Sequence, residues 1–214
     1  VANAVSRIKS LGGTAQELVF DVSVDSARAA ALSTIASEHD RLDILINNVG
    51  MRDRRPIEEV DGPDFQALLQ VNLTSAFLLC REVVGFMRDQ QWGRIVNISS
   101  VFGREYGGAP SYMAAKASVI AFSKNIALTV APNNVLVNTN APGSIRFQGG
   151  SWDRFTRNNT PEVVEQFIDR NLPMGRFGWP EPVGETVAFL CSESANMITG
   201  ASITVDGGQS RSLI

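Results

Sequence analysis

Short apolar runs alternate along this chain with longer amphipathic stretches, and this alternation constrains the fold more than any other feature. The apolar runs are nearly continuous in Val, Ile and Leu, which is typical of parallel strands buried on both faces. We expect strands at residues 17–22, 43–47, 94–99, 135–138 and 202–205. We expect helices at residues 2–11, 25–38, 64–89, 111–131, 161–170 and 182–192. This order predicts an α/β fold, a doubly wound parallel sheet with helices on both faces.

The 214 residues are expected to form a single domain, 1–214, because no linker, repeat or low-complexity tract interrupts them. The least regular stretch is 144–160, which is rich in Gly, Ser, Arg, Asn and aromatic residues. Long irregular segments inside a compact domain are usually functional. We therefore interpret 144–160 as a loop that forms a substrate lid.

Composition argues against several classes of function. A formal net charge of −3 gives no basic surface for nucleic acid. No apolar run approaches the roughly 20 residues that span a membrane, and residues 1–9 lack an export signal pattern. The two cysteines, Cys80 and Cys191, lie in apolar helical contexts, which favours free thiols in a reducing cytoplasm. With one histidine, His39, we expect no metal site.

The first candidate for chemistry is the pair Tyr112 and Lys116 in Ser-Tyr-Met-Ala-Ala-Lys. Positions i and i+4 share one face of a helix, so the phenol and the ammonium should project side by side. A neighbouring cation favours the phenolate form of a tyrosine, and such a pair can exchange a proton with an alcohol or alkoxide. The alternative is that this spacing occurs on a helix by chance.

Two serines, Ser99 and Ser100, end the strand expected at 94–99. Ligand sites in open α/β sheets lie at the carboxyl ends of strands, where a serine could hydrogen-bond a carbonyl oxygen. The alternative is that the serine caps a turn or a helix. The family resemblance given in the next paragraph favours Ser100 over Ser99, because Val-Phe-Gly follows Ser100.

In their order and spacing, these motifs resemble those of the short-chain dehydrogenase/reductase family. The similarity runs from residue 1 to about residue 209. Each motif is weakly specific by itself, but all of them together, in this order and at this spacing, make the similarity specific. It rests on Asn47-Asn48-Val49-Gly50, Asn72 in Gln-Val-Asn-Leu-Thr, Ser100, Tyr112 with Lys116, Ala141-Pro142-Gly143-Ser144-Ile145, Ile198-Thr199-Gly200 and Val205-Asp206-Gly207-Gly208.

The resemblance implies a catalytic set. Tyr112 would be the general acid/base, and Lys116 would favour its phenolate and hold the nicotinamide ribose. Ser100 would orient the substrate oxygen, and Asn72 would hold a water in a proton relay. The cofactor-binding positions implied by the family are Asp21 and Val22 at the adenine, Asn48 and Gly50 along the cofactor, Tyr112, Lys116, and Pro142, Gly143 and Ile145 at the nicotinamide.

Other motif positions have structural interpretations. Asn47 is better explained as a hydrogen-bonding residue within the sheet, and Asp206-Gly207-Gly208 as a turn. Trp152 and Phe155 could line the substrate pocket or pack the lid, and the sequence favours neither.

The sequence departs from the family pattern most clearly near its start. The family's strand and Thr-Gly-x-x-x-Gly-x-Gly turn, which hold the pyrophosphate, are not found. We therefore expect a fold lacking its first βαβ unit, with buried strand edges left unpaired, and interpret the sequence as N-terminally incomplete. The alternative is a genuinely truncated protein. A smaller departure is Phe147, where many relatives have a cofactor-binding threonine.

The family implies an NAD(P)-dependent oxidoreductase that reduces a ketone to a secondary alcohol or the reverse. The sequence looks nearest to 3-oxoacyl-carrier-protein reductases and related sugar or alcohol dehydrogenases, and it does not distinguish NAD from NADP. The competing hypothesis is a cofactor-binding-deficient remnant that acts as an oligomerisation or interaction module.

Partners are expected to be a small carbonyl or alcohol substrate and further copies of the chain, with no nucleic acid and no membrane. The helices expected at 64–89 and 111–131 are apolar on more than one side. In the family that the sequence resembles, these helices form the subunit interface, so we expect a homodimer or homotetramer. Six arginines could attract an anionic group, although solvated loop charge is the favoured interpretation: Arg52, Arg54, Arg55, Arg146, Arg154 and Arg157.

Overall fold

The computed structural model describes residues 2–53 and 55–213, so Arg54 lies outside the described residues. The chain divides into two compact units, Val1–Arg41 and Leu42–Ile214. The smaller unit contains two helices, α1 (Ala2–Ser10) and α2 (Asp25–Glu38), which match the expected helices closely.

The strand expected at 17–22 is wrong. Residues 13–21 have no regular secondary structure, and the segment pairs with no strand among the described residues. A strand is stable only when a neighbour satisfies its backbone groups. The adjacent apolar side chains of Leu18 and Val19, which would point to opposite faces of a strand, are 36% and 81% exposed, so neither face is buried as the pattern implied.

The larger unit is built on a four-stranded sheet in the order β1-β2-β3-β4, with every pairing parallel. The four remaining strand predictions are confirmed at β1 (Ile44–Asn47), β2 (Gly93–Ile98), β3 (Val135–Pro142) and β4 (Ser202–Val205). The two central strands, β2 and β3, carry the core, because their apolar side chains are buried on both faces.

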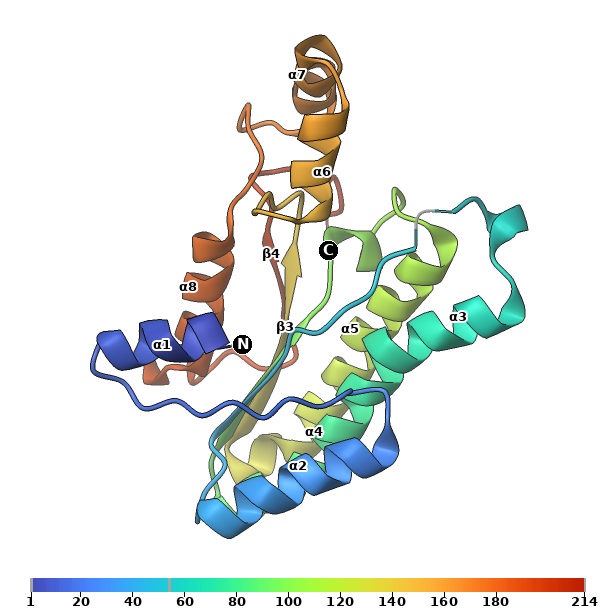
Figure 1. Ribbon diagram of the computed structural model, residues 1–214. Coiled ribbons are helices and arrows are strands. Elements are labelled where there is room, and N and C mark those ends of the chain that lie inside the picture. The colour runs from blue at the N-terminus through green and yellow to red at the C-terminus, as the bar shows by residue number, and fades with distance from the viewer. Residues whose placement is uncertain (1, 54, 214) are drawn as a thin grey trace. The chain divides into compact units, whose positions relative to one another are not determined.

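Helices cover both faces of this sheet. Within the larger unit, Figure 1 shows α4 and α5 on one side of the strands and α8 on the other. The predicted α/β fold is therefore confirmed. The helices of these layers are α3 (Gly62–Leu69), α4 (Ser75–Gln90), α5 (Pro110–Val130) and α8 (Pro180–Cys191), with short 3₁₀ turns at Ile57–Glu59, Val101–Gly103, Ala131–Asn133 and Glu193–Ala195.

The helix expected at 64–89 runs through a π-helical turn at Gln70–Thr74 that joins α3 to α4. Among the described residues, the continuous helix Gly62–Gln90 is the one that is long and apolar enough to cross a membrane by length and composition. Its α4 portion packs on β2 and α5, as the core helix of a globular unit does. Pro63 near the start of α3, behind the Asp61 N-cap, fixes where this helix begins.

Above the carboxyl ends of the strands lie α6 (Ser151–Asn158) and α7 (Pro161–Asn171) (Figure 1). The prediction of an irregular loop at 144–160 is therefore wrong for the second half of that range. The Gly and Asn residues of this stretch favoured the loop prediction, but Ser151–Asn158 is a helix. Its Trp152 packs against three rings: Phe155, Phe167 and Phe177. Tertiary packing of this aromatic cluster outweighs the weak helix propensity of the segment.

Candidate active site

The carboxyl ends of β1, β2 and β3 open into a cavity of about 880 Å³ in the larger unit. Parallel strands present their carboxyl ends at one edge, which brings distant motifs together there. Eight of the predicted site residues line this cavity: Asn48, Gly50, Ser100, Tyr112, Lys116, Pro142, Gly143 and Ile145.

Tyr112 and Lys116 project from the same face of α5, as their spacing predicts. Both side chains are buried, with exposed fractions of 9% and 5%. The Lys116 Nζ donates a hydrogen bond to the Ile98 carbonyl at 2.8 Å and lies 5.8 Å from the centre of the Tyr112 ring. Burial, with a smaller contribution from the charge of Arg52, lowers the pKa of Lys116 to about 8.

Ser100 performs the capping role that was its alternative interpretation, and it also faces the cavity. Its Oγ accepts a hydrogen bond from the Phe102 backbone N–H at 3.2 Å. A hydroxyl that accepts in this way keeps its own proton for donation. The neighbouring Ser99 instead donates to the Lys116 carbonyl at 2.9 Å, so its proton is already engaged.

Asn72 lies in the π-helical turn between α3 and α4, where its side chain is buried. Its Oδ1 accepts from the Met51 N–H at 3.1 Å, and its Nδ2 donates to the carbonyls of Met51 at 2.9 Å and Leu68 at 3.0 Å. These bonds fasten the loop after β1 to the helix. A Cβ built on Gly50 would lie 3.0 Å from the Asn72 Oδ1 and 3.6 Å from the Lys116 Nζ, so this loop passes close to both.

Gly143 follows β3 and approaches another part of the chain too closely for a side chain. A Cβ there would lie 2.7 Å from both the Asp206 Cβ and the Gln209 Oε1. The Gln209 side chain accepts from the Ser144 N–H at 2.7 Å. The Ser144 hydroxyl is buried and has no hydrogen-bond partner among the described residues. This segment is the expected nicotinamide border, and it offers an unused polar group there.

Asp21 and Val22 lie in the smaller unit, whereas the cavity is formed by residues of the larger unit. The Asp21 Oδ1 accepts from the Ser23 N–H at 2.8 Å and from the Ser23 Oγ at 2.6 Å, and these bonds lower the pKa of its carboxyl group. Their contact with adenine stays a prediction.

Asn47 acts as the sheet residue that was expected. Its Nδ2 donates to the Asn97 Oδ1 at 2.7 Å across β1 and β2, and Asn97 in turn donates to the Ser123 Oγ at 2.8 Å. The Asp206 side chain likewise accepts from the backbone of Gly208 and forms the expected turn.

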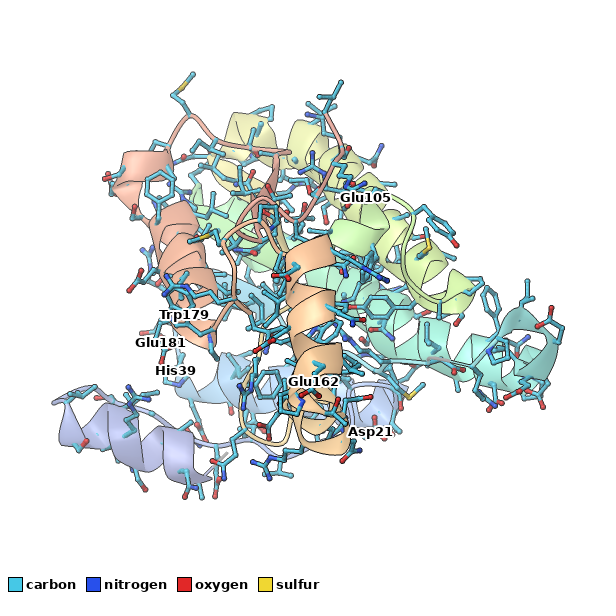
Figure 2. All side chains as sticks on the ribbon, turned by 90° about the horizontal axis from the view of Figure 1, so that it is seen from above. Asp21, His39, Glu105, Glu162, Trp179 and Glu181 are labelled. Atoms are coloured by element: carbon cyan, nitrogen blue, oxygen red, sulfur yellow. The ribbon has the colours of Figure 1, made fainter. Side chains whose placement is uncertain are left out.

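A second cavity of about 880 Å³ shares Tyr112 with the first. Trp152 and Phe167 form its apolar wall, so Trp152 both lines a cavity and packs the aromatic cluster. Figure 2 labels Glu105, which lines this second cavity, and, to its left, Trp179, which directly precedes α8. The sequence indicated Trp152 as one of two possible pocket or lid residues, but it did not indicate Phe167 or Glu105, because the walls come from segments far apart in the chain.

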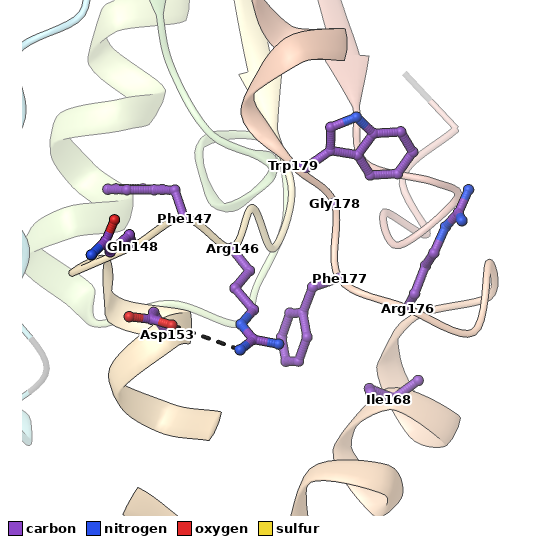
Figure 3. Close-up of a pocket in the computed structure, with 9 residues that line it drawn as sticks. All are labelled: Arg146, Phe147, Gln148, Asp153, Ile168, Arg176, Phe177, Gly178 and Trp179. Carbon is purple, nitrogen blue, oxygen red and sulfur yellow. Dashed lines mark ion pairs between the residues drawn. The ribbon is translucent and has the colours of Figure 1, made fainter. Parts of the chain in front are cut away.

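The loop before α6 is held by the buried carboxylate of Asp153. It accepts from the Gly149 N–H at 2.9 Å, and this bond, with Arg157 at 3.0 Å and Arg146 at 3.7 Å, lowers the pKa of the Asp153 carboxyl group. Figure 3 shows the Arg146 pair beside a smaller cavity of about 490 Å³. Phe147 lines both this cavity and the active-site cavity, and it offers no hydrogen-bond donor there.

Among the described residues, no group of three or more His, Cys, Asp or Glu side chains could hold a metal ion. The polar side chains that line the active-site cavity include serine hydroxyls, the Tyr112 phenol, the Lys116 ammonium, the Asn48 amide and the guanidinium groups of Arg52 and Arg154. Such a set can bind and protonate an oxygen atom.

Comparison with known proteins identifies the class to which this fold and site belong. A family profile described as enoyl-(acyl carrier protein) reductase matches residues 2–210. The chain belongs to the short-chain dehydrogenase/reductase family, as its motifs indicated. Members of this family are dehydrogenases and reductases that use NAD or NADP.

Two curated relatives and one solved structure illustrate the similarity. A 3-oxoacyl-[acyl-carrier-protein] reductase of Aquifex aeolicus is 42% identical over 79% of this chain and 66% of its own length. A cyclopentanol dehydrogenase of Comamonas sp. is 34% identical over 96% of this chain and 80% of its own length. A 4-hydroxyisoleucine dehydrogenase solved in complex with NADH superposes with a TM-score of 0.81 at 28% identity, over 91% of this chain and 81% of that one.

Proposed function

We propose that this protein is an NAD(P)-dependent oxidoreductase that reduces a ketone, a 3-oxoacyl thioester or a similar compound, to a secondary alcohol, or catalyses the reverse. The observation that carries the proposal is the convergence of Ser100, Tyr112 and Lys116 on one cavity at the carboxyl ends of the strands. The chain spans 66% and 80% of the lengths of the two curated relatives above, a reductase of oxoacyl groups and a dehydrogenase of a secondary alcohol.

The cavity suits the nicotinamide end of such a cofactor. Gly50 and Gly143 line it, and the nearby Ser144 hydroxyl is buried with no partner within the described chain. Lys116 and Tyr112 would hold the ribose, and Asn48 would flank the cofactor. The nicotinamide ring would be bordered by Pro142, Gly143 and Ile145. The adenine would be contacted by Asp21 and Val22. When bound, the cofactor supplies or takes up a hydride.

The chain's own residues would handle the proton. In reduction, the Ser100 hydroxyl donates a hydrogen bond to the carbonyl oxygen, and Tyr112 gives its phenolic proton to the oxygen as the carbon gains a hydride. The products are a secondary alcohol and a phenolate. The cation of Lys116 stabilises that negative charge, and Asn72 keeps the neighbouring loop in place and would hold a relay water that returns a proton.

Titration with NADH and NADPH, followed by oxidation of each with 3-oxoacyl thioesters, diketones and keto-sugars, tests the proposal and identifies the cofactor. Tyr112→Phe is the matched variant, since it removes the acidic proton and keeps the ring. We expect nucleotide binding in both proteins and turnover in the wild type, reduced at least about 100-fold in the variant. Equal turnover in both proteins would refute the role of Tyr112.

A second candidate function is an oligomerisation or interaction module that does not bind the cofactor. Exposed apolar side chains on α4 and α5 favour an interface in either case: Phe77, Phe86 and Leu128 are 42%, 45% and 66% exposed. We propose a homodimer or homotetramer through these helices, and light scattering at micromolar concentration tests it. Absence of binding to either nucleotide, together with a stable oligomer, would favour the module.

We further propose that residues 144–160 act as a substrate lid and that the protein is cytoplasmic. Helix α6 lies above the carboxyl ends of the strands (Figure 1), and its Ser151 and Arg154 line the active-site cavity, which supports the lid. The free thiols of Cys80 and Cys191 support a reducing compartment. Burial raises the pKa of the Cys80 thiol to about 12, so we expect this thiol to be unreactive.

A further inference from the structure

Arg52 occupies a position that the proposed chemistry does not use. It follows the Asn-Asn-Val-Gly motif after β1 and lines both of the cavities that share Tyr112. Its guanidinium carbon lies 5.4 Å from the centre of the Tyr112 ring, and its Nη1 donates to the Ser151 Oγ at 2.9 Å. The cation therefore stands beside the proposed proton donor and the first residue of α6.

The charge of Arg52 is not balanced by a carboxylate. Its two partners, Tyr112 and Ser151, are neutral, and no ion pair joins it to an acidic residue within 2–53 and 55–213. Arg55, three residues further on, contrasts with it. Its guanidinium pairs with Asp53 and Asp64 at 2.6 Å each.

The acidic residues on the walls of the second cavity are already engaged. Asp53 pairs with Arg55, and Glu105 accepts from the Arg211 backbone N–H at 2.8 Å. The positive charge of Arg52 also acts on the buried Lys116, where it contributes to the lowered pKa. An anion bound at Arg52 would relieve this repulsion between two cations.

We infer that Arg52 binds a carboxylate of the substrate and so makes the protein selective for oxo acids over neutral ketones. The guanidinium matches a carboxylate in a two-pronged hydrogen bond. Because Arg52 and Tyr112 line the same two cavities, one substrate can present a carboxylate to Arg52 and a carbonyl to Tyr112. The reaction remains that proposed above: the carbonyl carbon gains a hydride, its oxygen gains the Tyr112 proton, and the carboxylate is unchanged.

The inference rests on the proposed function, and its test compares two ketones that differ in charge and by one methyl group. The substrates are 3-oxobutanoate and its methyl ester, and the readout is kcat/KM for each with the nucleotide that the protein uses. The variants are Arg52→Gln, the conservative Arg52→Lys, and Arg81→Gln as the control. Arg81 lies on the exposed side of α4, where it pairs with Glu82.

We expect the wild type to prefer the acid, and the acid-to-ester ratio of kcat/KM to fall about 10- to 100-fold in Arg52→Gln, mainly through KM. Arg52→Lys should recover part of the ratio, and Arg81→Gln should leave it unchanged. An acid-to-ester ratio that is unchanged in Arg52→Gln would overturn the inference. If kcat/KM falls by the same factor for both substrates, the role of Arg52 is merely structural.

Calorimetric binding of 3-hydroxybutanoate and butan-2-ol separates this inference from the proposed function. The proposed function fails if no ketone of the panel above is turned over, whereas the role of Arg52 is decided by binding alone. Binding of the acid that weakens about 10-fold in Arg52→Gln supports the site. Equal binding by wild type and variant, or no binding of the acid by either, refutes it.

Discussion

Replacing the buried Lys116 by methionine should stabilise the protein and abolish its pH-dependent stability in mildly alkaline solution. The pKa of this lysine is about 8 in the folded protein, against 10.5 for the unperturbed group, chiefly because the ammonium is buried. Below pH 8 the group is charged in both states, and the folded state bears the cost of burying it. Between pH 8 and 10.5 the folded protein releases the proton that the unfolded chain still holds.

The stability of the wild type should therefore rise with pH across that window. At about 1.4 kcal/mol for each pKa unit, the rise amounts to roughly 3 kcal/mol between pH 8 and 10.5. Methionine fills a similar volume without the charge, but it forfeits the hydrogen bond to the Ile98 carbonyl, at about 1–2 kcal/mol. The expected net gain for Lys116→Met at pH 7 is about 1–2 kcal/mol.

Urea unfolding at pH 7 and pH 10 measures both quantities. Tryptophan fluorescence reports on the larger unit, because Trp92, Trp152 and Trp179 all lie in it. Lys124→Met, an exposed lysine on α5, is the matched control and should keep the alkaline rise. A wild type whose stability does not change, or a Lys116→Met variant that keeps the same rise, would refute the reasoning.

Three further substitutions test the packing around the site. The Asn140 amide is fully buried on β3, and neither its Oδ1 nor its Nδ2 is paired among the described residues. Asn140→Val should therefore raise the free energy of unfolding, measured in urea, by about 1–2 kcal/mol. A free energy of unfolding below that of the wild type would show that the amide is satisfied. Asn72→Ala should lower that free energy by about 2–3 kcal/mol, since three hydrogen bonds disappear; no change would show that the π-helical turn holds without them. Gly103→Ala should lower it by about 1–3 kcal/mol, because the new Cβ would lie 2.7 Å from the Lys116 carbonyl; an unchanged thermal midpoint would contradict this.

The strands of the larger unit were predictable because their residues are apolar on both faces, which few other structures tolerate. The segment 17–22 has a similar apolar pattern, but a pattern reports what a residue favours and not whether a hydrogen-bonding neighbour exists. Helix α6 was missed for the opposite reason. Gly149 and Gly150 before it and Asn158 and Asn159 at its end indicate a loop, whereas the packing of Trp152 on Phe167 and Phe177 favours the helix.

Local spacing predicted the helical pair and the serines after a strand, and the family resemblance supplied the other residues of the candidate site, of which eight in all line the cavity. Tyr112 and Lys116 must share a helix face, and Ser100 must end a strand. The position of Arg52 was not predictable in this way. Its contact with Tyr112 joins residues sixty positions apart, through a loop whose course depends on the hydrogen bonds of Asn72 to Met51.

The most direct test of the central claim follows the hydride itself. The protein is incubated with a ketone substrate and a reduced nicotinamide nucleotide that carries deuterium at its transferable ring position, and the product is examined by mass spectrometry. The proposed function predicts a secondary alcohol with one deuterium on the carbinol carbon, formed by the wild type and strongly reduced in Tyr112→Phe. An alcohol without deuterium, or no alcohol with any ketone that the cavity admits, would contradict it.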